Sequence, residues 1–312
     1  SELELKQKYE IGKTYNSEDS WKESTLDEIT TLKQNIMTGL DTTTAKALTE
    51  KDLTKAENNI KINEYRLEHN MPPFMSGSIA GGSIGKTRKI YDYMMNSLTM
   101  MVLAVMIIII AGSSISSEIS KGTIKFWSFT PNKRWKILTA KILSLLFYLI
   151  IITLIMSILS IILANVFFNT SGYEYLFMKD GNVQKIGNTL FTIEYYFVKL
   201  IPVIIFAILA LMFSTITRNT SLSIGLSLAT YMGNSIVMVI IDSYIKKDWV
   251  KLIPFNNLNI AEKVFPNFTS MLSMGFDTQI TTSLSFALTV LAVCTVLMLV
   301  TMYDSFNKRD II

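Results

Sequence analysis

The stretch that comes closest to a known chemical motif is residues 80–87, which read Ala-Gly-Gly-Ser-Ile-Gly-Lys-Thr. A phosphate-binding loop has the pattern G-x-x-x-x-G-K-[ST], and its backbone amides hold phosphate only between a buried strand and a helix. Here Ala80 replaces the first glycine, and the preceding MPPFMSGS is too rich in Pro, Gly and Ser to form a buried strand. We therefore interpret this stretch as a linker and expect no nucleotide to bind there.

Other residue types that perform catalysis are scarce or badly placed for it. The single histidine, His69, and the single cysteine, Cys294, exclude a multi-histidine metal site, a cysteine cluster and an internal disulfide. Ionisable residues fall near the ends of the apolar segments, whereas ion-coupled carriers and intramembrane enzymes need such groups at depth. These observations predict a protein that is not an enzyme and that binds no metal or cofactor itself.

The composition indicates the elements that must carry any function. Of the 312 residues, 50% are hydrophobic and only 17% are charged, and the hydrophobic residues cluster in long runs. The formal net charge of +4 is small, and no basic surface interleaved with aromatic residues indicates nucleic-acid binding. Because a membrane-spanning helix needs about 20 apolar residues, we predict an all-α polytopic membrane protein that contacts the lipid bilayer.

Five apolar stretches have the length of a membrane span, and they cover residues 93–113, 141–168, 195–217, 222–244 and 283–303. Residues 1–90 are polar and are expected to form a helical domain and linker, which leaves 91–312 as the transmembrane domain. Residues 246–280 mix aromatic and polar side chains. This mixture favours short amphipathic helices at the outer membrane interface, with an ordinary long loop as the alternative.

The distribution of Lys and Arg predicts the orientation of the spans. The loop between the first two spans, the loop at Arg218 and the C-terminal tail together carry nine basic residues, against six in the opposite loops. Because loops rich in Lys and Arg stay inside, we expect the C terminus in the cytoplasm of a bacterium and residues 1–90 outside. A domain exported without a signal peptide needs a preceding helix, so we expect a sixth span upstream of the five.

The most distinctive pattern lies between the first two spans, where residues 117–141 read SEISKGTIKFWSFTPNKRWKILTAK. A Glu at the end of one span is followed by a Gly-Thr pair, a Pro, a basic pair and a Lys at the start of the next span. This segment resembles the corresponding part of ABC-2 type ATP-binding-cassette exporter permeases. The terminal SFNKRDI and the LIPFNNLN segment are also similar to that family. The resemblance covers about residues 90–312.

The resemblance implies an ABC-2 exporter-type helix bundle, in which residues 114–140 form a cytoplasmic coupling loop that docks on a separate ATPase subunit. That partner would bind ATP and Mg and perform the hydrolysis. The alternative is an amphipathic helix held by lipid, with its tryptophans at the headgroups. The residues expected to couple to the ATPase are Glu118, Gly122, Thr123, Lys125, Phe126, Trp127, Pro131 and Arg134.

Small residues recur at every fourth position of the 222–244 span, at Ser221, Gly225, Ala229 and Gly233. A ridge of small residues lets another helix approach closely within a membrane. We favour packing inside the helix bundle over a subunit interface. A subunit interface would join this chain to a second permease, either an identical copy or a paralogue.

The expected function is export of a hydrophobic or amphipathic substrate, because the spans offer an apolar path and no charged one. The large outer domain is similar to that of permeases for peptides, so an antimicrobial or cytolytic peptide is the first expectation and a lipid-linked molecule the second. Sodium export is disfavoured by the uncharged spans. A membrane sensor or immunity protein that binds peptide through residues 1–90 remains a hypothesis, as does a membrane enzyme.

Overall fold

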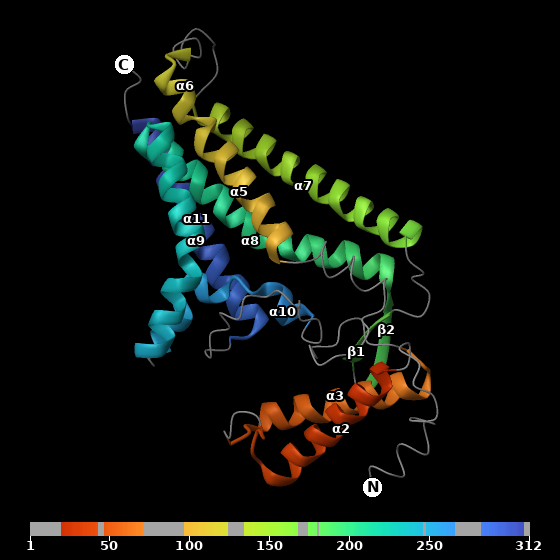
Figure 1. The fold of residues 1–312 in the computed structure, drawn as a ribbon. Helices are drawn as coiled ribbons and strands as arrows, with labels where there is room; N and C mark the ends of the chain where they lie inside the picture. Colours follow the sequence, from red (N-terminus) through yellow and green to blue (C-terminus); the bar gives the residue numbers. More distant parts are fainter. Residues whose placement is uncertain are drawn as a thin grey trace. The chain divides into compact units, whose positions relative to one another are not determined.

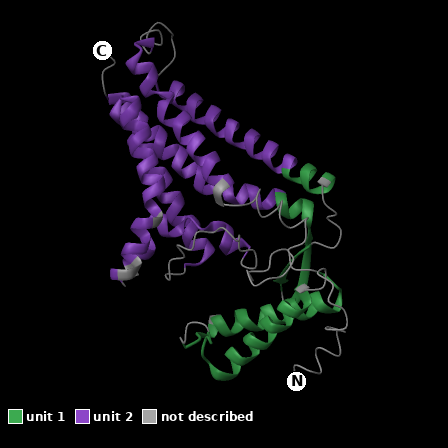
Figure 2. Cartoon of the chain, in the orientation of Figure 1, with its two compact units in different colours: residues 1–93, 160–192, 267–271 green, residues 94–159, 193–266, 272–312 purple. Residues whose placement is uncertain are grey.

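The computed structural model describes residues 20–42, 47–71, 97–123, 134–167, 174–179, 181–245, 248–265 and 282–308. The described chain is mostly helical, as Figure 1 shows. It divides into two compact units, drawn in green and purple in Figure 2. Unit 1 comprises residues 1–93, 160–192 and 267–271, and unit 2 comprises residues 94–159, 193–266 and 272–312.

Unit 1 contains a helical hairpin, in agreement with the helices expected in the polar N-terminal region. Its two helices, α2 (Ser20–Thr38) and α3 (Glu50–Glu68), lie side by side (Figure 1). Apolar residues spaced at helical intervals form the core between them, because this spacing places them on one face of each helix. The buried members of this core are Leu26, Ile29, Ile60 and Leu67.

The start of α3 is fixed by a capping box. The Thr49 hydroxyl accepts a hydrogen bond from the backbone amide of Asp52, and the Asp52 carboxylate accepts one from the amide of Thr49. These bonds satisfy amides that the first helical turn leaves without a partner. The Thr49 hydroxyl also donates to the Asp52 carboxylate at 2.6 Å. This bond first, and then the bond from the Thr49 amide, hold the pKa of the Asp52 carboxyl below its usual value, because both stabilise the charged form.

Unit 1 also contains a two-stranded antiparallel sheet, a small addition to a chain that is mostly helical, as expected of an all-α membrane protein. Strand β1 (Glu174–Lys179) pairs with β2 (Asn182–Gly187), with Glu174 opposite Gly187 and Lys179 opposite Asn182. The turn uses Gly181 at φ +79°, a conformation that favours glycine. Helix α3 packs on this hairpin, where Tyr175 and Leu176 are buried.

Unit 2 is built on long apolar helices, of which α5 (Ser97–Ser114) is followed at once by the short α6 (Ser116–Ser120). Two long helices, α7 (Arg134–Phe167) and α8 (Asn188–Thr217), have most of their length in this unit. The others are α9 (Thr220–Tyr244) and α11 (Leu284–Lys308).

Among the described residues, four helices are long and apolar enough to cross a membrane, and they cover Thr99–Ser120, Arg134–Val166, Asn188–Thr217 and Leu284–Lys308. The protein is therefore a mostly helical, membrane-associated protein. The span expected over residues 222–244 forms helix α9, which is not one of these four. Its sequence places Ser, Thr and Asn side chains among the apolar ones.

The helices extend beyond several predicted span boundaries. Helix α7 begins at Arg134 rather than at residue 141, α8 begins at Asn188 rather than at 195, and α11 continues to Lys308 rather than ending at 303. Apolar runs locate only the part of a helix that fits the hydrocarbon, whereas polar residues continue the same hydrogen-bonded helix outside it. The expected loop over residues 114–140 is consequently shorter, because its last residues are helical.

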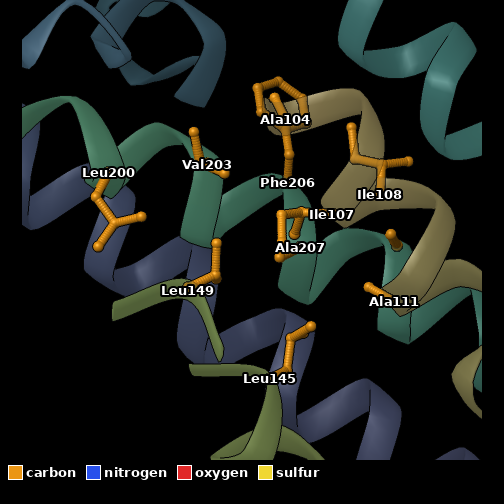
Figure 3. Packing of buried hydrophobic residues seen from close by; sticks show 11 residues of the cluster. Ala104, Ile107, Ile108, Ala111, Leu145, Leu149, Leu200, Val203, Phe206 and Ala207 are labelled. Atoms are coloured by element: carbon orange, nitrogen blue, oxygen red, sulfur yellow. The ribbon is translucent and has the colours of Figure 1, made fainter. Parts of the chain in front are cut away.

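The central core of unit 2 joins α5, α7 and α8, as Figure 3 shows. Small side chains on α5 and α8 allow the helices to approach closely, while larger ones fill the remaining space. Phe206 extends the core towards α9, where its ring meets that of Tyr231 edge-on at 4.9 Å. The cluster consists of Ala104, Ile107, Ile108, Ala111, Leu145, Leu149, Leu200, Val203, Phe206, Ala207 and Ala210.

Short helices follow α9, where the sequence predicted them. They are η2 (Asp248–Leu252), η3 (Pro254–Asn257) and α10 (Ile260–Val264), while residues 266–281 lie outside the described part of the chain. The buried amide of Asn257 donates to the carbonyl oxygens of Lys251 and Ile253 at 2.8 and 3.0 Å. Its own oxygen accepts from the Thr282 hydroxyl at 2.8 Å, which ties η3 to the start of α11.

Candidate functional site

Half of the predicted coupling residues belong to the described part of unit 2. Glu118 belongs to α6, and Gly122 and Thr123 follow shortly after that helix. Arg134 is the first residue of α7, and its side chain is exposed. The remaining predicted coupling residues lie outside the described residues. These are Lys125, Phe126, Trp127 and Pro131.

An ion pair that the sequence did not predict joins α6 to α7. The Lys141 ammonium lies 2.7 Å from Oε1 of Glu118 and donates a second hydrogen bond, of 2.6 Å, to the carbonyl oxygen of Ser114. Ser114 is the last residue of α5, whose final carbonyls have no partner within the helix. Lys141 therefore caps one helix and neutralises a carboxylate on the next.

The second carboxylate oxygen of Glu118 is in a different situation. Oε2 is buried, yet it has no hydrogen-bond partner among the described residues. A buried carboxylate oxygen is normally hydrogen-bonded, because losing water without a replacement partner is unfavourable. The Glu118 carboxylate can therefore accept a further hydrogen bond without giving up Lys141.

Backbone geometry ends α6 just beyond Glu118. Gly122 has φ +70°, and its amide donates to the carbonyl of Ile119 at 3.1 Å. The Thr123 hydroxyl donates to the carbonyl of Glu118 at 3.2 Å. A left-handed glycine after the last helical turn is a common helix C-terminus, so these two residues fix where the chain leaves α6.

The corner between α5 and α6 is held by a residue that the sequence analysis did not identify. The hydroxyl oxygen of Ser214, on α8, accepts hydrogen bonds from the amides of Ile115 and Ser116 at 3.2 and 2.9 Å. All three residues are fully buried. The Ser116 hydroxyl donates in turn to the carbonyl of Gly112 at 2.8 Å. A serine in an apolar helix gave no sequence signal, because its partners lie in a distant part of the chain.

Apolar contacts next to this corner bring together the ends of three long helices. The cluster joins Ile115, between α5 and α6, to residues from the ends of α7, α8 and α11, and Tyr303 of α11 shares a 2.7 Å hydrogen bond with Thr139 of α7. A displacement of α6 would consequently act on several long helices. The buried members are Ile115, Leu138, Leu211, Met302 and Phe306.

Small residues on α9 occupy two faces with different roles. The buried face carries Ser223 and Ser227, and Ile224 beside them lies so close to α5 that a Cβ atom on Gly112 would come within 3.2 Å of its Cγ1 atom. The predicted ridge faces elsewhere. Its members Ser221, Gly225 and Ala229 are exposed and Gly233 is half-buried, and a Cβ atom on either glycine would meet no atom within 4 Å. Among the described residues, the packing inside the chain therefore does not use this ridge.

Across the described ranges, no group of three or more His, Cys, Asp or Glu side chains could hold a metal ion. What the corner offers is a partly buried ion pair, a carboxylate oxygen that can accept one more bond, and direct packing onto the ends of long helices. Such an arrangement suits contact with another molecule and transmission of movement.

A family described as "Protein of unknown function (DUF2705)" matches residues 60–312. The chain belongs to this family. The DUF2705 match begins within α3 and extends through α11, so it includes Glu118, Lys141 and Ser214. The chain is also similar to the uncharacterized protein YhcI of Bacillus subtilis (strain 168), at 29% identity over 259 residues, which cover 81% of this chain and 75% of that protein. No solved structure matches the chain significantly.

Proposed function

We propose that this chain is the permease subunit of an ABC-2 type exporter, which moves a hydrophobic or amphipathic substrate out of a bacterial cell. Antimicrobial or cytolytic peptides are the first substrate class to test. A separate subunit would bind ATP and Mg and hydrolyse the nucleotide. The sequence pattern from Glu118 to Lys141 and the long apolar helices support this proposal.

The observation that carries the proposal is the carboxylate of Glu118. One oxygen is bound by Lys141, and the other is buried with no partner among the described residues. A donor group on a docked ATPase would complete this carboxylate. Because α6 continues directly from α5 and shares an apolar cluster with the ends of α7, α8 and α11, a force on the loop after α6 would reach all four helices.

The proposal includes an orientation and a further span. Helix α6 with Glu118 and the C terminus face the cytoplasm, and residues 1–90 lie outside. Helix α9 also crosses the membrane, since its 25 residues extend about 37 Å at about 1.5 Å per residue, more than the roughly 30 Å of hydrocarbon. The exposed ridge of Ser221, Gly225, Ala229 and Gly233 would then contact a second permease.

Affinity purification in mild detergent tests the partner. The full-length protein is isolated from its native cell, and co-purifying proteins are identified by mass spectrometry. We expect a stoichiometric ATPase that is lost when Glu118 is replaced by Arg. A protein kinase in its place would support the sensor hypothesis, and the absence of any ATPase would reject the exporter.

Matched glycine variants test the coupling. Gly122→Ala forces a left-handed backbone on a residue that disfavours it, although a Cβ atom would meet no neighbour within 4 Å. Gly181→Ala imposes the same strain in the β-hairpin, also in open space. We expect Gly122→Ala to lower substrate-stimulated ATPase activity of the reconstituted complex severalfold and Gly181→Ala to leave it unchanged. Equal effects of the two variants would contradict the proposed coupling role.

A further inference from the structure

Unit 1 contains a buried positive charge, that of Arg66, which is separate in the sequence from Glu118 and its partners. Arg66, in the last turn of α3, is only 8% exposed, and Asn63, one helical turn earlier, is 3% exposed. The hydrophobic neighbours Ile60 and Leu67 belong to the core with α2. Helix α3 also packs on β1, where the ring of Tyr175 is buried. Arg66 interacts electrostatically with that tyrosine.

The described residues provide no ion-pair partner for this guanidinium. Its one side-chain hydrogen bond in that part of the chain runs from Nη1 to Oδ1 of Asn63 and is long, at 3.4 Å. Glu28 interacts with Arg66 electrostatically but is itself exposed and forms no ion pair with it. Burial lowers the pKa of Arg66, and the charge of Glu28 opposes that shift only partly.

Beside the Arg66 guanidinium, Asn63 presents a buried hydrogen-bond donor without an acceptor. Its oxygen accepts the bond from Arg66, whereas its buried amide nitrogen Nδ2 has no hydrogen-bond partner among the described residues. Two neighbouring side chains thus offer buried N–H groups: the Asn63 amide lacks an acceptor among the described residues, and the Arg66 guanidinium lacks an ion-pair partner there. Buried donors are rarely left in this state, and buried charges are normally paired.

We propose that Arg66 and Asn63 form a binding site for a carboxylate group of a ligand. The planar guanidinium matches a carboxylate through two parallel hydrogen bonds, and the Asn63 amide can donate another to the same group. A carboxylate supplies both the negative charge and the acceptor oxygens that the pair lacks. The narrow exposure of Arg66 restricts the site to a small group, such as a chain terminus or an acidic side chain.

This site does not depend on the proposed exporter function, because it is argued from unit 1 alone. A structural role for Arg66 is the competing explanation. An arginine that only stabilises the fold would do so through its bond to Asn63, and its removal would leave the oxygen of Asn63 unpaired and destabilise the protein. A carboxylate site that awaits its ligand predicts the opposite, since loss of an unpaired buried charge relieves an unfavourable term.

The test uses the full-length protein in nanodiscs and hydrogen–deuterium exchange of α3 and β1. Sodium acetate is the probe, inorganic phosphate tests the other common oxyanion, and sodium chloride at equal ionic strength is the reference. At about ten times its dissociation constant, acetate should slow exchange of these amides about tenfold, because it stabilises only the folded site. Arg66→Met should abolish the acetate effect without accelerating exchange in the absence of acetate.

Lys33→Met is the matched control. It also removes one positive charge from the hairpin, but Lys33 is half-exposed and already paired with Glu64 at 3.0 Å, so this variant should retain the acetate effect. The proposal is overturned if acetate acts no more strongly than chloride, or if phosphate alone protects the amides. It is also overturned if Arg66→Met accelerates exchange while acetate has no effect on the original protein.

Discussion

Replacing Lys141 with methionine isolates the contribution of the Glu118–Lys141 pair. Methionine keeps an unbranched apolar side chain of similar length, so packing along α7 should change little. The variant loses the 2.7 Å contact with Glu118 and the 2.6 Å bond to the carbonyl of Ser114. It leaves the Glu118 carboxylate charged, partly buried and without either of its oxygens satisfied by the described residues.

The expected loss of stability lies between two known limits. Breaking a fully buried ion pair by removing one partner costs about 3–5 kcal/mol, whereas an exposed pair contributes about 0.2–1 kcal/mol. The side chains of Lys141 and Glu118 are 17% and 30% exposed. We therefore expect Lys141→Met to lower the free energy of unfolding by about 2 kcal/mol, between these limits.

A double-mutant cycle separates the pair from other effects. The single variants Lys141→Met and Glu118→Gln and the double variant are unfolded in mixed micelles of increasing SDS content, and helicity is followed by circular dichroism. Because the double variant leaves no unpaired charge, its loss should be about 1.5 kcal/mol smaller than the sum of the single losses.

An exposed pair of the same length provides the control. Lys308 lies 2.7 Å from Asp304 one turn away on α11, with the two side chains 76% and 56% exposed. Lys308→Met should change the free energy of unfolding by less than about 0.5 kcal/mol. The reasoning fails if the Lys141 and Glu118 variants prove additive within about 0.3 kcal/mol, or if both lysine variants have the same effect.

Three further predictions concern Ser214, Gly112 and Asp52. Ser214→Ala should lower the free energy of unfolding by about 1–3 kcal/mol, because two buried amides lose their acceptor; Ser227→Ala, which loses only a bond to a carbonyl of its own helix, should have a smaller effect in the same SDS titration. Gly112→Ala should destabilise by about 1–3 kcal/mol through overpacking against α9, while Gly225→Ala should stabilise by up to about 1 kcal/mol through helix propensity; the reverse order in thermal unfolding in detergent would contradict the α5–α9 packing. Asp52, whose pKa is lowered in the folded state, should stabilise α3 above its unfolded pKa near 3.8, and this contribution should disappear as the pH falls through the still lower folded pKa. Amide exchange of α3, corrected for the intrinsic pH dependence, should show this loss, and Asp52→Asn should remove it.

The long helices could be predicted because hydrophobic runs of their length have few alternatives, whereas the β-hairpin was missed. Its strands are short, and its signal is an Asp180-Gly181 turn dipeptide with Tyr175 and Phe177 alternating before it. That signal lies between two stretches assigned to membrane spans. The length of apolar runs, which identifies the spans, does not distinguish a short hairpin from a loop in such an interval. The start of α7 at Arg134 was missed for the same reason.

The candidate site was predicted only in part. The sequence pattern selected Glu118 and Lys141 as separate members of one loop, but it did not reveal that they pair. The role of Ser214 could not be predicted, because a serine in an apolar helix most often bonds to its own backbone. The burial of Arg66 could not be predicted, since a single sequence does not show which charge of a polar helix the fold will bury.

The Ser214 bond also constrains the order in which the chain can mature. The amides of Ile115 and Ser116 wait for an acceptor that is 99 and 98 residues further along the sequence. At a synthesis rate of about 5–20 residues per second, that delay is about 5–20 s. During this interval the corner between α5 and α6 needs water or the insertion machinery to satisfy its amides. The corner is therefore assembled late, and the end of α5 reaches its final form only after α8 has been made.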